Sequence, residues 1–232
     1  MLKSDFSKYR GALRPPQIAS GINAARRNAR RLADDAKLLL EADRYPTAAA
    51  MAVLSIEESG KITILRQFAS IPDTERKRLW REYQSHQKKN VMWILPDLVA
   101  SGARDLDSLA PAADTSGEHT ALLDQIKQIS LYTDCLGNAH WTEPEKVIDR
   151  EVANRLVSTA DLLARSSFTT ETEIELWKKH MAPVYGAPMD VQKAALVNWF
   201  SAMKENGLRD KDDTPPTIEE FLFGEAAPTA DE

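Results

Sequence analysis

Apolar residues recur along most of the chain at steps of three and four, the spacing that places them on one face of an α-helix. The first stripe predicts a helix over about residues 19–42. Pro46 suits the first turn of a second helix over about residues 46–69. That helix is apolar all round near its start, which is typical of a helix in the centre of a bundle. The first stripe comprises Ile22, Ala25, Ala29, Leu32, Ala33, Ala36, Leu39 and Leu40.

The rest of the chain shows the same helical spacing, and no stretch alternates apolar and polar residues as a strand would. A third helix is expected from about residue 74 to Asp97, followed by a long loop over 101–118. Four more helices are expected over about 119–135, 143–166, 171–182 and 190–207. The fold class is therefore an all-α helical bundle with additional C-terminal helices.

The pattern divides the chain into three parts. Residues 1–17 form an N-terminal extension, and 18–207 form a single α-helical domain. Residues 208–232 are rich in acidic residues and proline, so a mostly disordered tail is expected. Phe221, Leu222 and Phe223 are the residues that would dock this tail locally.

Composition is that of an ordinary globular protein. The chain has 232 residues, of which 43% are hydrophobic, and only 9 are Gly and 12 Pro, which excludes collagenous and low-complexity classes. Cys135 is alone, so no disulfide forms within the chain, and a buried small side chain is expected there. No apolar run approaches the roughly 20 residues of a membrane span, and no secretory signal opens the chain. We expect a cytoplasmic protein with no membrane partner.

Charge is distributed unevenly around a net value of −5. Residues 1–100 carry 18 Lys and Arg against 11 Asp and Glu, whereas residues 101–232 carry 12 against 24. A basic half can attract the phosphates of a nucleic acid, although solvated helix faces explain such an excess equally well.

Candidate chemistry lies where polar residues interrupt the apolar faces. Glu57 falls on the core stripe of the second helix, with Glu58 beside it and Lys61 four residues on. A carboxylate in that position is costly to bury unless it is paired. The pattern is open to two interpretations: a buried salt bridge with Lys61, or a carboxylate pair held in a cleft. No phosphate-binding loop, cysteine pair or His-Glu-x-x-His motif accompanies it, so no cofactor and no metal are expected.

The third helix offers a partner for these carboxylates. His86 falls on its apolar stripe, with Lys88 and Lys89 just beyond it. Because a short turn joins the second and third helices, they should pack antiparallel, with His86 at the depth of Glu58. A carboxylate beside an imidazole fixes its tautomer and prepares it for general acid–base catalysis.

Several motifs together resemble one known family. Arg44-Tyr-Pro opens the second helix, which carries Glu57-Glu-Ser-Gly-Lys61, and His86-Gln-Lys-Lys89 and Leu131-Tyr-Thr-Asp134 follow in order. Over roughly residues 18–166 the sequence resembles the AbiV family of abortive-infection proteins, which act in bacterial phage defence. It also resembles the wider HEPN superfamily of α-helical domains, in which many ribonucleases carry Arg-x(4–6)-His.

The resemblance implies a HEPN-like bundle and a metal-independent ribonuclease whose site is shared by two protomers. His86 would be the general acid or base, oriented by Glu57 or Glu58. Arg81, five residues before His86, would stabilise charge on the phosphate, and Lys61, Lys88 and Lys89 would bind substrate RNA. Five residues correspond to about 140° around a helix, so Arg81 would serve the site of the other protomer in a homodimer.

The alternative is a non-catalytic binding or regulatory protein that contacts a phage or host protein. In that interpretation the polar cluster is structural, and Trp141, Trp177 and Trp199 supply partner surface unless they are core residues. Tyr132 is expected to pack against the second and third helices, and Asp134 to pair locally.

Overall fold

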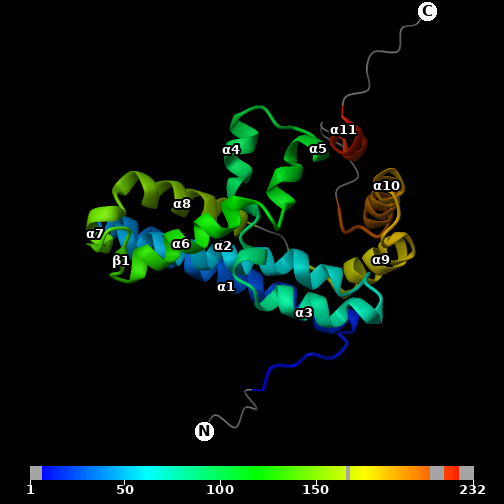
Figure 1. Cartoon of the computed structure of the whole chain (residues 1–232). Coiled ribbons are helices and arrows are strands. Elements are labelled where there is room, and N and C mark those ends of the chain that lie inside the picture. The colour runs from blue at the N-terminus through cyan, green and yellow to red at the C-terminus, as the bar shows by residue number, and fades with distance from the viewer. Residues whose placement is uncertain (1–6, 166–167, 210–216, 225–232) are drawn as a thin grey trace, which may run out of the picture.

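The computed structural model describes residues 7–165, 168–209 and 217–224. Its centre is an antiparallel pair of long helices, α1 (Pro15–Glu41) and α2 (Tyr45–Gln67). Helix α2 packs against α1, α6 (Glu118–Leu131) and α8 (Arg150–Leu163), so it is covered on several sides (Figure 1). Four of its eleven buried residues are alanines near its start, and these small side chains let the neighbouring helices approach closely. The all-α prediction and the central position of the second helix are confirmed.

Two apolar clusters hold the bundle together. The larger joins α1, α2, α6 and α8 around Val53, Ile56 and Leu123. The smaller joins the start of α1 and the end of α2 to α9 (Glu171–Met181) around Ile22 and Ile174. Helix α10 (Met189–Glu205) packs on α9, so the C-terminal helices extend the bundle at this end.

The predicted third helix is broken into pieces. Helix α3 (Arg76–Gln84) follows a 3₁₀ turn, Asp73–Glu75, and ends at Ser85, whose backbone is extended. Two further 3₁₀ turns, Gln87–Lys89 and Met92–Ile94, lead into α4 (Leu95–Ala100). The break has a tertiary cause, because it brings the backbone of Lys89 directly against Gly60 of α2.

Other boundaries also differ from the sequence prediction. The expected loop 101–118 contains α5 (Leu106–Leu109) and a 3₁₀ turn, Ala110–Ala113. The expected helix 143–166 is two helices, α7 (Pro144–Val147) and α8, because the side chain of Asp149 caps a new helix start.

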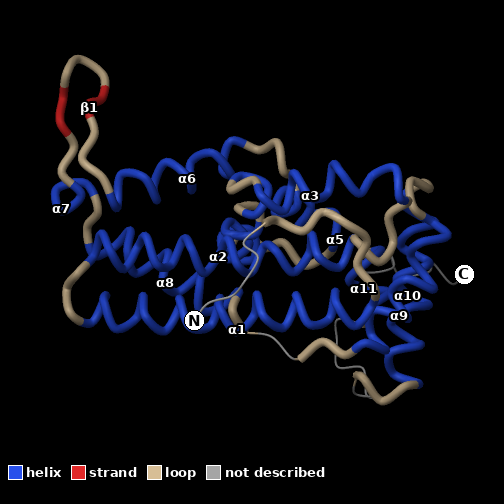
Figure 2. Tube along the Cα trace, turned by 90° about the horizontal axis from the view of Figure 1, so that it is seen from below, coloured by secondary structure: helices blue, strands red, loops and turns tan. Residues whose placement is uncertain are grey.

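A small hairpin contradicts the expectation of no strands. Strands β1 (Cys135–Leu136) and β2 (His140–Trp141) pair antiparallel beyond the end of α6, and the hairpin projects from the bundle (Figure 2). The predictions for Cys135 and Tyr132 were therefore wrong, because both are exposed. Asp134 does pair locally, since its carboxylate accepts from the Cys135 amide at 2.7 Å.

The C-terminal part of the chain is only partly described. Helix α11 (Ile218–Phe223) lies inside the segment expected to be disordered and contacts α5 and α10. Leu222 is buried there and Phe221 half-buried, whereas Phe223 is 54% exposed, so the docking predicted for these three residues is met only in part. The rest of the predicted tail, 210–216 and 225–232, lies outside the described residues. No helix in the described ranges is long and apolar enough to cross a membrane.

Asp161 of α8 ties that helix to α1. Its carboxylate accepts hydrogen bonds from Lys37 at 2.5 Å, Arg30 at 2.8 Å and Arg165 at 2.7 Å. The Lys37 hydrogen bond, aided by the two guanidinium groups and opposed by partial burial, holds the pKa of Asp161 well below its usual range. The cations thus favour the ionised carboxylate in the folded state.

Asp161→Asn should lower the free energy of unfolding at pH 7 by about 2 kcal/mol, the scale of hydrogen bonds to a charged group. The wild-type carboxylate binds its proton more weakly when folded, so its contribution is present above about pH 4 and is lost as the pH falls further. Urea unfolding from pH 7 to pH 3 should show the two proteins converging at acid pH. If the difference in the free energy of unfolding between the two proteins stayed constant with pH, this explanation would be wrong.

Two helical glycines make a matched test of the packing. A Cβ at Gly60 would lie 2.1 Å from the carbonyl oxygen of Lys89, whereas a Cβ at Gly21 would meet Leu65 at an ordinary 3.5 Å. Gly60→Ala should therefore destabilise the fold by about 1–3 kcal/mol, because backbone must move. Gly21→Ala should raise stability by up to about 1 kcal/mol, since alanine favours a helix. Thermal unfolding of both variants measures the contrast.

Candidate functional site

The site is built around Glu57, a carboxylate buried in the middle of α2. Its side chain is only 5% exposed, so its charge must be balanced by nearby donors. Oε2 lies 2.7 Å from Nδ1 of His86, and Oε1 accepts a hydrogen bond from Nζ of Lys127 at 2.6 Å. The Lys89 ammonium lies 3.7 Å from Oε2. Three segments far apart in the sequence therefore meet at one carboxylate.

The 3₁₀ turn Gln87–Lys89 positions two of the side chains that lie next to Glu57. His86 is the residue that precedes the turn and Lys89 the one that ends it. Their side chains reach Glu57 because Gly60, one turn further along α2, has no side chain to keep the Lys89 backbone away. The glycine of the Glu57-Glu-Ser-Gly-Lys61 motif thus has a packing role.

His86 joins the buried carboxylate to the surface. Its side chain is 57% exposed, although Nδ1 is held by Glu57. When Nδ1 carries the proton and donates to Glu57, the other ring nitrogen, Nε2, is left with a free lone pair. The expectation of an inward-facing histidine is therefore met only in part, because one edge of the ring contacts the core and the other is accessible.

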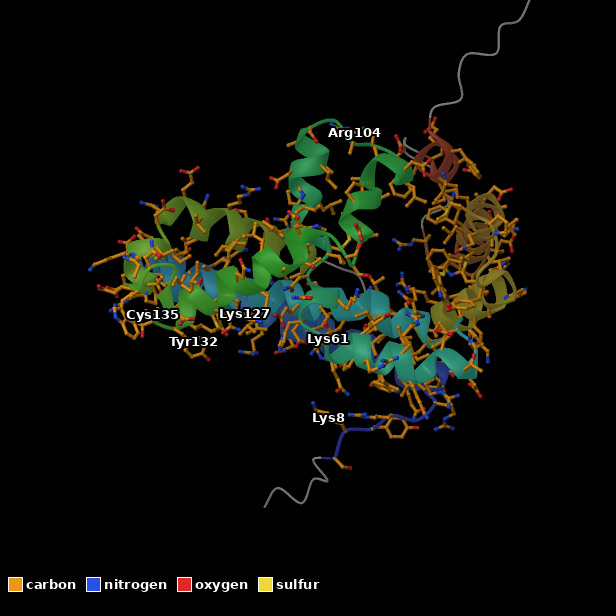
Figure 3. The ribbon with its side chains drawn as sticks, in the orientation of Figure 1. Lys8, Lys61, Arg104, Lys127, Tyr132 and Cys135 are labelled. Carbon is orange, nitrogen blue, oxygen red and sulfur yellow. The ribbon has the colours of Figure 1, made fainter. Side chains whose placement is uncertain are left out.

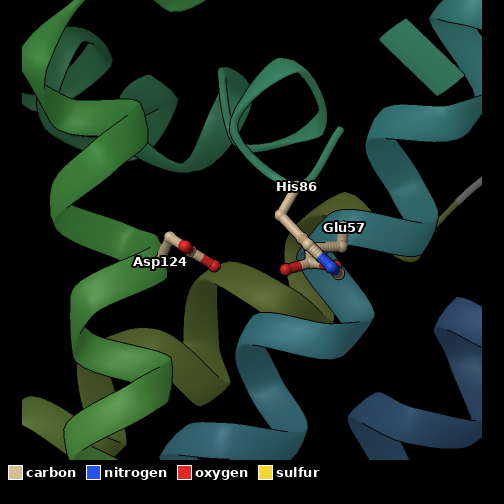
Figure 4. A group of neighbouring side chains, drawn as sticks. All are labelled: Glu57, His86 and Asp124. Carbon is tan, nitrogen blue, oxygen red and sulfur yellow. The ribbon is translucent and has the colours of Figure 1, made fainter. Parts of the chain in front are cut away.

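Helix α6 supplies two residues that the sequence did not single out. Lys127 is buried and lies 2.7 Å from the Asp124 carboxylate as well as 2.6 Å from Glu57. Figure 4 shows Asp124 pointing from α6 toward the Glu57–His86 pair. A signal for Lys127 exists in the sequence, because it lies four residues after Leu123 on the buried face of α6.

The two buried lysines respond differently to their surroundings. Burial lowers the pKa of Lys89, and the more distant Glu57 charge only partly opposes that effect. Burial acts on Lys127 in the same direction, but its hydrogen bonds to Asp124 and Glu57 outweigh it and raise the pKa of Lys127. Lys127 is therefore a firmly charged structural cation, whereas Lys89 gives up its proton more readily than an ordinary lysine.

Glu57, His86 and Asp124 also form the type of group that can bind a metal ion. Their ligand atoms all lie within 4.8 Å of one another. However, Lys127 contacts both carboxylates and Lys89 lies close to one of them. The lysines already balance the two negative charges, and a cation would have to displace Lys127.

The other predicted site residues lie in two different places. The sequence predicted Glu58 at the depth of His86, but Glu58 instead pairs with Lys61 at 2.5 Å. The ammonium group of Lys61 also lies over the ring of Tyr83. The expected Glu57–Lys61 pair is thus replaced by Glu58–Lys61. Lys61, His86 and Lys89 line one pocket of about 460 Å³. Arg81 and Lys88 line a second pocket, and Lys88 donates to Thr115. Arg81 also lines a third pocket, which shares Trp80 and Gln84 with the His86 pocket.

Among the tryptophans, only Trp141 is a surface residue. It is 67% exposed on the hairpin, together with Leu136 and Tyr132. Trp199 is buried and Trp177 packs edge-on against it at 5.1 Å.

The fold and the site define an all-α protein with a carboxylate–imidazole pair beside a lysine-lined pocket. The comparison with protein families gives the more specific assignment. The family model for HEPN AbiV, described as AbiV, matches residues 17–165, and the chain belongs to this family. Membership links the chain to abortive infection, a form of phage defence. No curated protein and no solved structure matches the chain.

Lys127→Met tests the charge balance at Glu57. Removing the ammonium leaves the buried Glu57 and the partly exposed Asp124 without their main counter-ion, so the free energy of unfolding should fall by about 3 kcal/mol. Lys146→Met is the control, because Lys146 forms an exposed pair with Glu143. Its effect should stay below about 1 kcal/mol. Chemical denaturation of both variants provides the measurement, and equal effects would show that Lys127 has no special role.

Proposed function

We propose that this AbiV-family chain acts in phage defence as a metal-independent ribonuclease, with His86 as its general base. The observation that carries the proposal is the contact of 2.7 Å between the buried Glu57 and an imidazole whose other edge faces a pocket. This is the arrangement that fixes a histidine tautomer and leaves a ring nitrogen to accept a proton.

The reaction follows from the groups around the pocket. Nε2 of His86 would take the proton of a ribose 2′-hydroxyl, and the 2′ oxygen would attack the adjacent phosphorus. The bond from phosphorus to the 5′ oxygen would break, and that oxygen would take a proton from water or from Lys89. The products would be a 2′,3′-cyclic phosphate and a 5′-hydroxyl end. Lys61 and Lys89 line the same pocket and would stabilise the negative charge of the phosphorane.

Arg81 has a role in this proposal only through a second copy of the chain. Within one chain Arg81 is not among the residues that line the His86 pocket, although it lines a neighbouring pocket that shares Trp80 and Gln84 with it. In a homodimer, Arg81 and Lys88 of one copy would contact the RNA held by the other. The proposal places this assembly in the cytoplasm, where RNA is available.

A second candidate function is the binding of a phage or host protein. The projecting hairpin favours it, because Trp141, Leu136 and Tyr132 are exposed together at the end of the bundle away from α3 (Figure 2). Exposed aromatic residues in such clusters are typical of protein interfaces. The hairpin would recognise the trigger of infection, whether or not the chain cleaves RNA.

His86→Ala is the decisive variant. Loss of a general base should reduce RNA cleavage by the purified protein about 10²- to 10⁴-fold. His140→Ala is the matched control, since His140 is an exposed histidine on the hairpin, far along the chain from the site. Cleavage would be measured with and without EDTA, and EDTA should have no effect. Circular dichroism would establish that each variant is folded.

Two results would contradict the proposal. Equal cleavage by wild type and His86→Ala would remove His86 from the site. Phage protection that persists in His86→Ala cells, with intact RNA throughout, would favour the binding function instead. In that case protection should be lost in Trp141→Ser cells.

A further inference from the structure

The N-terminal segment before α1 lies against α3, next to the His86 pocket. Its described residues, 7–14, precede the part of the chain that the AbiV model matches. The indole nitrogen of Trp80 donates to the Gly11 carbonyl at 3.1 Å, and the ring of Tyr9 meets Trp80 edge-on at 6.2 Å. Figure 1 shows the segment running beneath α3. These two contacts hold the N-terminal segment against Trp80 of α3.

This contact gives the His86 pocket an additional wall. Lys8 and Tyr9 come from the segment, and Figure 3 shows Lys8 on the same side of the molecule as Lys61. The volume of about 460 Å³ lies within the range of small-molecule sites, about 300–1,000 Å³. The complete lining in the described part of the chain is Lys8, Tyr9, Lys61, Trp80, Tyr83, Gln84, His86 and Lys89.

The side chain of Tyr9 is held in place from within the segment. Its hydroxyl donates to the Ala12 carbonyl at 2.8 Å, and the ring occupies space that a Cβ on Gly11 would fill. The ring is nevertheless 58% exposed, so it is available to a ligand. Tyr9 therefore presents a fixed aromatic surface at low entropic cost.

The lining has the chemistry that a nucleotide requires. Three lysines offer charge to phosphate, three aromatic rings offer surfaces for a base, and none of the eight lining residues is acidic. Aromatic stacking with a base is available only when the base has left a double helix. The pocket therefore matches an unpaired nucleotide better than a base-paired one.

We propose that residues 7–14 form part of the substrate site, with Lys8 binding a backbone phosphate and Tyr9 stacking on an unpaired base next to the cleaved bond. This inference rests on the proposed ribonuclease function and extends it to a segment outside the family match. It assigns substrate-binding residues to the N-terminal extension.

The test measures binding apart from cleavage. A fluorescent single-stranded oligoribonucleotide would be titrated with full-length His86→Ala protein, and with the same protein carrying further changes. Lys8→Ala should weaken binding and reduce the slope of log affinity against log salt by about 0.7, the value for one phosphate contact on a single strand. Lys146→Ala is the matched control, because Lys146 is an exposed cation that pairs with Glu143 and is not among the residues that line the pocket. It should leave the slope unchanged.

Tyr9 is tested by two substitutions. Tyr9→Ala should weaken binding of the single strand about tenfold, within the range for loss of one stacked base. Tyr9→Phe keeps the ring and should bind within about twofold of the parent. A base-paired version of the same oligonucleotide should bind more weakly than the single strand to the parent protein, and Tyr9→Ala should not change its affinity.

The outcomes separate this inference from the proposed function. If wild type cleaves RNA but Lys8→Ala and Tyr9→Ala bind as the parent does, the extension is no part of the site, and the ribonuclease proposal stands. An equal loss of affinity in Lys8→Ala and Lys146→Ala would also overturn the inference, because it would indicate general charge attraction. If wild type neither binds nor cleaves the oligonucleotide, both proposals fail.

Discussion

The arrangement of the site follows from one constraint, a carboxylate buried in the centre of a helical bundle. Glu57 lies on the helix that the other helices surround, and an ionised group there is stable only with partners close by. Lys127 reaches it from α6, and His86 and Lys89 reach it from the turn after α3. The break in the third helix and the close contact at Gly60 both serve this purpose, because a continuous helix would not bring the Lys89 backbone so near α2.

The pairing of charges around Glu57 also explains why the core-facing side of the site differs from its surface-facing side. Toward the core, two carboxylates and two lysines nearly cancel one another. Toward the surface, His86, Lys8 and Lys61 face a pocket that Lys89 also lines, and its remaining walls are aromatic or amide side chains. The imidazole connects the two sides, since Glu57 fixes one nitrogen and the other remains accessible. A charge-balanced interior thus lies beside a pocket lined by basic side chains.

The basic first part of the chain and its acidic remainder form different surfaces of the molecule. Every residue that lines the His86 pocket comes from the basic first 100 residues. The exposed hairpin comes from the acidic remainder and lies at the other end of the bundle from α3 (Figures 1 and 2). The two proposed activities, RNA cleavage and protein binding, therefore concern separate surfaces of the molecule.

The sequence by itself determined the helical class, the central helix and the identity of Glu57, His86 and Lys89. Helical spacing identifies a charged residue on a buried helix face as clearly as it identifies an apolar one. It did not determine the partners. Glu57 rather than Glu58 meets His86, Lys127 joins from 70 residues away, and the N-terminal segment closes the pocket. The interrupted third helix was missed for the same reason, whereas the hairpin was missed because its two-residue strands are too short to show an alternating pattern. Local preference for a helix is worth less than 1 kcal/mol per residue, so the tertiary demand to pair a buried charge can overrule it.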